Sequence, residues 1–196
     1  MESRFEHSHV FRMPGLLHRD LIRLVSCRLE SCSWITRDDG KIAREASPES
    51  PAPAGVLNFV ANTSEFLDLI RRITHCHQIT WFDGRVYRME SSTDHFDSWH
   101  ADLGTPPQDR FVGMSINLGS RPYRGGIFRL RDEASGKVLC ELPNTGQGDG
   151  IFFRISPALK HIVTSIEGSE PKTAFAGWFR SGEVDYYADL RRPART

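Results

Sequence analysis

The chain has 196 residues, and its 25 lysines and arginines balance 25 aspartates and glutamates, so the formal net charge is zero with neutral histidines. This length suits a single domain, 1–196, with a substantial core. A balanced charge gives no long-range attraction to nucleic acid or to an anionic membrane, and no apolar run approaches the roughly 20 residues that span a bilayer. We therefore expect no nucleic-acid partner and no membrane partner, and the sequence leaves the oligomeric state open.

The cysteine pattern predicts a reducing environment. The four cysteines are scattered, with no Cys-x-x-Cys pair, whereas small disulfide scaffolds are much denser in cysteine. The first residues also lack the basic-then-apolar order of a secretory signal. We expect free thiols and a cytoplasmic protein. The cysteines are Cys27, Cys32, Cys76 and Cys140.

The N-terminal part, 1–78, predicts a helical buttress. Apolar residues recur at helical spacing over about 15–30, directly after a proline–glycine turn. A second helix is indicated where an N-capping sequence at 62–65 precedes another apolar stretch. Between the two, 36–55 is polar and rich in proline, alanine and serine, which predicts a mobile surface segment over a site.

The remainder, 79–185, predicts a β-rich core. A strand over 79–82 and another over 85–89 are separated by Asp83-Gly84, which is typical of a tight hairpin turn. Further strand candidates, each bounded by turn residues, are 111–118, 126–131, 137–142, 150–155, 162–166 and 173–180. Helices followed by many short strands predict a mainly β fold with N-terminal helices and a double-stranded β-helix (jelly-roll) core.

Two histidines and one aspartate form a candidate metal site. His100 and Asp102 lie two residues apart, so on an extended strand end their side chains project to the same face. His161 is the third candidate, immediately before a strand-like apolar run. Two imidazoles and one carboxylate make the facial triad that suits non-haem Fe(II), and this triad leaves coordination positions open for other ligands.

A second His-x-Asp pair, His95 with Asp97, lies five residues upstream and is a rival register. Trp99 directly before His100, and the short step from there to the strand at 110–118, favour the later pair. The His75-Cys76-His77 run follows a helix end and has no partner at zinc-like spacing, so we interpret it as structural.

The motifs from Trp99 onward carry a family resemblance. They are Trp99-His100-x-Asp102, an arginine opening the strand at Arg110, the glycine pair Gly125-Gly126, Gly148-Asp149-Gly150, His161-Ile162-Val163, Lys172 and Trp178-Phe179. In this order they resemble the Fe(II)/2-oxoglutarate-dependent oxygenases, particularly the small prolyl 4-hydroxylase-like group. The resemblance by clear motif covers rather less than half of the chain.

The resemblance implies a role for a basic residue about ten positions after the distal histidine, where the family pairs it with the far carboxylate of 2-oxoglutarate. Here that position falls on Lys172, although arginine is commoner in this branch, and lysine lacks the bidentate fork of arginine. Arg180 and Arg110 are the alternative anchors. Asn117 or Ser115, which alternate on the strand expected to floor the pocket, is a candidate contact for the co-substrate.

The resemblance further implies that His100, Asp102 and His161 are the catalytic metal ligands, with Fe(II), 2-oxoglutarate and dioxygen as cofactor and co-substrates. The implied reaction is hydroxylation of an unactivated C–H bond, with release of succinate and carbon dioxide. Related halogenases lack the carboxylate ligand, so Asp102 favours hydroxylation, while desaturation or cyclisation depends on substrate placement. The mixed charge of 36–55 and 90–110 predicts a small polar, amino-acid-like or peptidyl substrate.

Two alternatives stay open at this point. The first is a cupin-like metal dioxygenase that does not use 2-oxoglutarate, although cupins usually recruit more histidines than this chain offers. The second is a non-catalytic binding module on the same fold. Dependence on 2-oxoglutarate distinguishes both from the first interpretation.

Overall fold

The structure is a computed structural model that describes residues 2–91, 94–104, 109–144 and 146–182, so the last residues of the expected 79–185 core lie outside it. Its helices are α1 (Glu2–Ser8), α2 (Arg19–Glu30), α3 (Ala52–Ala61) and α4 (Ser64–Thr74). Its strands are β1 (Val10–Met13), β2 (Trp34–Asp38), β3 (Ala43–Pro48), β4 (Trp81–Met89), β5 (Phe96–Asp97), β6 (Arg110–Asn117), β7 (Arg124–Gly125), β8 (Phe128–Asp132), β9 (Val138–Leu142), β10 (Gly150–Arg154), β11 (Leu159–Val163), β12 (Ile166–Glu167) and β13 (Lys172–Arg180).

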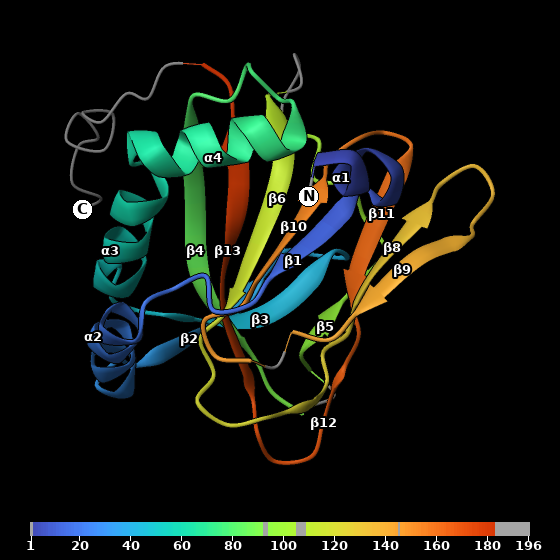
Figure 1. The fold of residues 1–196 in the computed structure, drawn as a ribbon. Coiled ribbons are helices and arrows are strands. Elements are labelled where there is room, and N and C mark those ends of the chain that lie inside the picture. Colours follow the sequence, from blue (N-terminus) through green and yellow to red (C-terminus); the bar gives the residue numbers. More distant parts are fainter. Residues whose placement is uncertain (1, 92–93, 105–108, 145, 183–196) are drawn as a thin grey trace, which may run out of the picture.

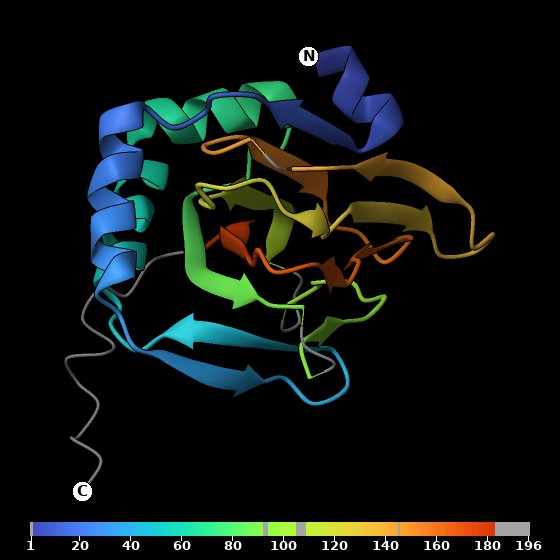
Figure 2. The same cartoon turned by 90° about the horizontal axis from the view of Figure 1, so that it is seen from below.

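The strands form one large antiparallel sheet and two small ones. The large sheet has the order β1-β10-β6-β13-β4-β3-β2, with β5 beside β3, while β11-β8-β9 and β12-β7 form the small sheets. Helices α2 and α3 lie at one flank of the molecule, and the β8–β9 hairpin projects at the other (Figures 1 and 2). The expected jelly-roll core with N-terminal helices is confirmed.

Side-chain alternation along β13, at the centre of the large sheet, separates two environments. Phe175 and Phe179 are at most 1% exposed and pack in a cluster with buried residues of α2, α3 and α4. Ala176 and Trp178 point to the opposite face and line a cavity. One face of the sheet therefore holds the main core with the helices, and the other holds the candidate site.

The expectation of a tight turn at Asp83-Gly84 is wrong, because β4 continues through both residues without interruption. Gly84 pairs with Gly177 of β13, and a side chain on Gly84 would lie 2.5 Å from the Phe82 ring. The glycine is therefore there for packing space. Its backbone N–H and C=O bond the side chain of Asn58 at 2.9 and 2.8 Å, so α3 takes the place of a neighbouring strand.

The first 78 residues are more than a helical buttress, because they also supply β1, β2 and β3 to the large sheet. The segment 36–55, expected as irregular, contains the end of β2, all of β3 and the start of α3. Pairing of Thr36 with Ala46 and of Ala46 with Arg88 joins this hairpin to β4. Local composition hides these strands because β1 pairs with the distant β10 and the β2–β3 hairpin is polar.

No helix in the described part of the chain is long and apolar enough to cross a membrane. Each of the four cysteines is a free thiol, and only Cys76 is buried.

Candidate functional site

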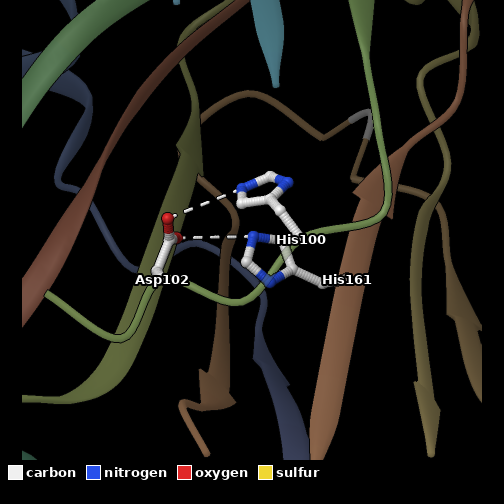
Figure 3. A group of neighbouring side chains, drawn as sticks. All are labelled: His100, Asp102 and His161. Carbon is white, nitrogen blue, oxygen red and sulfur yellow. Dashed lines mark ion pairs between the residues drawn. The ribbon is translucent and has the colours of Figure 1, made fainter. Parts of the chain in front are cut away.

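The structure brings His100, Asp102 and His161 together, with one ligand atom from each within 4.8 Å of the others (Figure 3). His161 lies on β11, and His100 follows β5 in extended conformation. The two backbones form an antiparallel bridge, in which the His100 N–H donates to the His161 carbonyl at 3.1 Å and the reverse bond is 2.9 Å. Asp102 follows in the loop after His100 and faces both rings.

The Asp102 carboxylate contacts one imidazole with each oxygen. Its Oδ1 lies 3.5 Å from His100 Nε2, and its Oδ2 lies 3.4 Å from His161 Nε2 (Figure 3). Burial alone would raise the pKa of Asp102, but its hydrogen bond with His100, the charges of both histidines and a hydrogen bond from Trp178 outweigh burial and lower it. Asp102 is therefore an anion across the physiological pH range.

The two histidines titrate in opposite directions. Burial disfavours a proton on His100, but the Asp102 hydrogen bond and the charges of Asp97 and Asp102 raise its pKa to about 9. Burial dominates at His161 and lowers its pKa to about 4, although Asp102 opposes this shift. His161 is thus neutral, as a metal ligand must be. The negative charges of Asp97 and Asp102, which favour a proton on His100, also favour a metal cation beside it.

These three side chains fit a first-row divalent metal. Ligand atoms that share one face of an octahedral site, with metal–ligand bonds of about 2.0–2.2 Å, are separated by about 3 Å. The His–Asp separations of 3.4 and 3.5 Å are close to that value. Among the described residues no other group of three histidines, cysteines or carboxylates could hold a metal, and the His75-Cys76-His77 run is not part of one.

The two residues of the rival pair, His95 and Asp97, have different surroundings. His95 lies away from the triad, where its Nδ1 accepts the Glu90 N–H at 3.0 Å. Asp97 sits behind His100, with its Oδ1 3.3 Å from His100 Nδ1. Burial raises the pKa of Asp97 to about 6, against the charges of His100 and Lys172 and two backbone hydrogen bonds.

A cavity of about 480 Å³ opens beside the triad. Its wall combines the pocket face of the large sheet with β8, β11 and the β2–β3 hairpin. Near the triad the wall is apolar, with Leu103, Phe128 and Phe153, whereas the outer wall carries charged side chains of both signs. The charged residues of the outer wall are Arg37, Asp39, Glu45, Arg85 and Arg110.

Lys172 begins β13 on the same face as Ala176 and is only 2% exposed. Its ammonium lies 5.8 Å from the ring centroid of Tyr87, which lines the cavity, although Lys172 itself is not part of the wall. No described carboxylate lies within 4.0 Å of this ammonium. Burial lowers the pKa of Lys172 to about 8, opposed by the charges of Asp97 and Glu45. A buried cation without a counter-ion is costly unless a ligand supplies the charge.

Asn117 and Ser115 are on β6, paired with Ala174 and Ala176 of β13 and so on the pocket face. The Asn117 Nδ2 and the Ser115 Oγ are both buried without a hydrogen-bond partner. Native proteins satisfy nearly all such groups, so the orphaned Ser115 hydroxyl, which lines the cavity, and the orphaned Asn117 amide, which shares its face of the sheet, indicate a site for a ligand or water. These two donors and Lys172 fit a dicarboxylate.

The two alternative anchors occupy other positions. Arg180, at the far end of β13, forms an ion pair with Asp109 through Nε at 2.8 Å and a closer one through Nη2. The Arg110 guanidinium stacks 3.7 Å from the Trp178 ring centroid and lines the outer cavity. Neither lies beside Asn117 and Ser115, so Lys172 has the better position of the three.

Sequence reasoning missed several residues of the cavity. Glu45 is 6% exposed, and its carboxylate binds Arg85 at 2.8 and 2.9 Å while Arg37 lies at 3.7 Å. Trp178 lines the cavity, and its side chain hydrogen-bonds Asp102. Asp83, Arg85 and Tyr87 alternate along β4, and this alternation could have indicated that they share a face. The expected turn at Gly84 divided the strand and so hid the pattern.

No protein-family model matches the sequence. No curated protein matches it either. Among solved structures, a prolyl-4-hydroxylase from Pseudomonas putida is similar at a TM-score of 0.66 with 14% identity, over 92% of this chain and 97% of that one. A 2OG-Fe(II) oxygenase family oxidoreductase from Burkholderia pseudomallei has a TM-score of 0.65 and 15% identity, over 91% and 88%.

A third similar structure is a prolyl hydroxylase from Trichoplax adhaerens, in complex with a peptide of the hypoxia inducible factor oxygen degradation domain. Its TM-score is 0.66 with 11% identity, over 97% of this chain and 90% of that one. The chain therefore has the fold of the 2-oxoglutarate–Fe(II) oxygenases, including prolyl hydroxylases.

Proposed function

We propose that this protein is an Fe(II)- and 2-oxoglutarate-dependent oxygenase that hydroxylates a C–H bond of a small polar, amino-acid-like or peptidyl substrate. The observation that carries the proposal is the combination of a metal-ligand triad with a buried, uncompensated cation on one face of the large sheet. A metal site alone would fit a cupin-like enzyme. A cation and two orphaned donors near the triad add the requirement for an anionic co-substrate.

Each group of residues then has a defined task. His100, Asp102 and His161 hold the metal from one side, which leaves the positions facing the cavity for other ligands. Lys172 neutralises the far carboxylate of 2-oxoglutarate, and the Asn117 amide and Ser115 hydroxyl are placed to donate hydrogen bonds to it. When bound, Fe(II) and 2-oxoglutarate let dioxygen oxidise a C–H bond to an alcohol, with succinate and carbon dioxide as co-products.

The outer cavity supports the substrate class. Its wall carries Arg37, Arg85 and Arg110 beside Asp39 and Glu45, several of which form ion pairs with one another, so charges of both signs face a polar substrate. The apolar residues nearest the triad keep water away from the reacting carbon. The peptide bound to the Trichoplax adhaerens structure shows that this fold accepts peptidyl ligands, which supports such a substrate here.

The test is an anaerobic titration with Fe(II) and 2-oxoglutarate, following the weak visible charge-transfer band of the chelate. We expect the band in the wild type, its loss in His100→Ala, and a requirement for much more 2-oxoglutarate in Lys172→Ala. Lys160→Ala is the matched control, since Lys160 precedes His161 but forms an ion pair with Glu133 at 2.6 Å. Bound metal without a band in the wild type would favour the cupin-like or non-catalytic alternative.

A further inference from the structure

Asp97 is held by the backbone through both of its carboxylate oxygens, although it is not one of the three candidate ligands. Its side chain is 10% exposed, and both of its oxygens have partners. Oδ2 accepts the Val163 N–H at 2.7 Å, and Oδ1 accepts the Ser98 N–H at 2.8 Å. Since these N–H groups come from different segments, the orientation of the carboxylate is fixed by the backbone on two sides.

This fixed carboxylate faces the rear nitrogen of His100. Its Oδ1 lies 3.3 Å from His100 Nδ1, and the Ser98 carbonyl oxygen lies 2.6 Å from the same nitrogen. Both neighbours of Nδ1 are acceptors, so Nδ1 carries the hydrogen. The lone pair of neutral His100 is then on Nε2, which points at Asp102 and at the space where a metal would bind.

Asp97 also acts on the strand that carries the second histidine. Val163, whose N–H it binds, lies two residues after His161 on β11. The two hydrogen bonds between the His100 and His161 backbones form an isolated bridge, with no strand on the His100 side to extend it. The Asp97–Val163 bond provides a third connection between the two segments.

The two histidines are supported differently. Among the described residues no hydrogen-bond acceptor reaches the rear nitrogen of His161, whose ring packs against Phe153, at 4.5 Å between centroids, and Phe128, at 5.8 Å. Aromatic packing thus orients His161, whereas His100 depends on polar contacts. A change at Asp97 should therefore act on one ligand directly and on the other only through β11.

We infer that Asp97 is a positioning residue of the metal site, which fixes the Ser98 backbone whose carbonyl accepts the His100 Nδ1–H, adds a negative charge beside that nitrogen and connects the His100 segment to β11. The inference rests on the proposed function, because it assumes that His100 is a ligand. Ligand histidines commonly donate their second N–H to a carboxylate or a backbone carbonyl, and mutation of such a supporting group typically costs about 10–100-fold in metal affinity.

The experiment is a Co(II) titration without 2-oxoglutarate and without dioxygen, following the visible d–d absorption of the bound metal. We expect Asp97→Asn to bind Co(II) about 10–100-fold more weakly than the wild type. Glu133→Gln is the matched control, since Glu133 also binds β11, through Lys160 at 2.6 Å, but on the outer surface. This control should leave the Co(II) affinity within about twofold of the wild type.

A second measurement does not depend on whether Asp97→Asn folds. In the Co(II)-loaded wild type, the exchangeable Nδ1–H of each ligand histidine gives a hyperfine-shifted proton resonance. We expect two unequal resonances, of which the one from His100 moves in Asp97→Glu while the one from His161 stays. Equal Co(II) affinity of wild type and Asp97→Asn, or an unmoved His100 resonance, would overturn the inference and leave the proposed function intact. A wild type that binds no Co(II) would overturn both.

Discussion

The two faces of β13 differ in what fills them. On the face toward the helices, Phe175 and Phe179 are buried among other aromatic rings, and the Phe82 and Phe179 centroids are 4.7 Å apart. On the face toward the cavity, Ala174 and Ala176 leave space and Lys172 buries a charge. One strand therefore packs against the core on one side and faces the cavity on the other, because alternation allows opposite residue types within nine positions.

The largest expected effect is on the helix face. Phe179→Ala removes a ring with 0% exposure and leaves a cavity against Phe66, Phe82 and Phe152, so we expect a loss of about 3–5 kcal/mol in the free energy of unfolding. Urea unfolding measures it. The folded protein should keep its affinity for 2-oxoglutarate within about twofold. A large loss of affinity with little loss of stability would contradict the division between the faces.

The opposite result is expected on the cavity face. Lys172→Met replaces a buried, uncompensated cation by an apolar side chain of similar length. We expect the free energy of unfolding to rise by about 1–3 kcal/mol, and the affinity for 2-oxoglutarate to fall by about 10–100-fold. Urea unfolding and the anaerobic chelate titration measure the two quantities. A variant that is destabilised and still binds normally would place Lys172 in the core rather than in the site.

The hydrogen bonds between Asn58 of α3 and the backbone of β4 test the helix face in a second way. Asn58→Ala leaves the N–H and C=O of Gly84 without their partner, and we expect a loss of about 1–2 kcal/mol in the free energy of unfolding. The neighbouring Phe59→Ala is the control, since Phe59 is 77% exposed and should change stability by no more than about 0.5 kcal/mol. Thermal or urea unfolding of both variants is sufficient. Equal effects would mean that α3 does not act as a neighbour of β4.

A further comparison is a pH dependence from Lys172. Burial lowers its pKa from 10.5 to about 8, so between these pH values the unfolded chain binds more protons than the folded one. The ligand-free protein should therefore gain stability as pH rises from about 8 to about 10.5, by at most about 1.4 kcal/mol per pH unit. The difference between wild type and Lys172→Met in urea unfolding at pH 8 and pH 10 isolates it. A difference that is independent of pH would show that the pKa of Lys172 is not lowered.

The elements that could be predicted from the sequence are those with a clear local pattern. Strands such as β6, β10 and β13 were expected within one or two residues, because burial on both faces or strict alternation marks them locally. β1 is an edge strand whose partner β10 is far away in the chain, and the β2–β3 hairpin has a polar sequence, so these short strands were missed. The same is true of α3, which begins at a proline-rich stretch that was interpreted as loop.

For the site, residue types selected His100, Asp102 and His161. The spacing supports the first two, because residues two apart on an extended segment share a face. The spacing could not say what each neighbouring carboxylate does. Asp97 and Asp102 flank His100 at similar distance in sequence, yet Asp97 meets its rear nitrogen and Asp102 its front one. That difference depends on where the chain turns after β5.

The sequence by itself determined the jelly-roll class and the three candidate metal ligands, which follow from local periodicity and residue chemistry, and it gave Lys172 as the candidate anchor through the family resemblance of its motifs. Only the tertiary structure decided which basic side chain is buried without a counter-ion, since Arg180 finds Asp109 across the sheet edge while Lys172 finds no carboxylate. It also decided that Asp97 lies beside the rear nitrogen of His100 and binds the backbone of β11. Ion pairs and hydrogen bonds between distant segments depend on the path of the whole chain, and local sequence patterns do not predict that path.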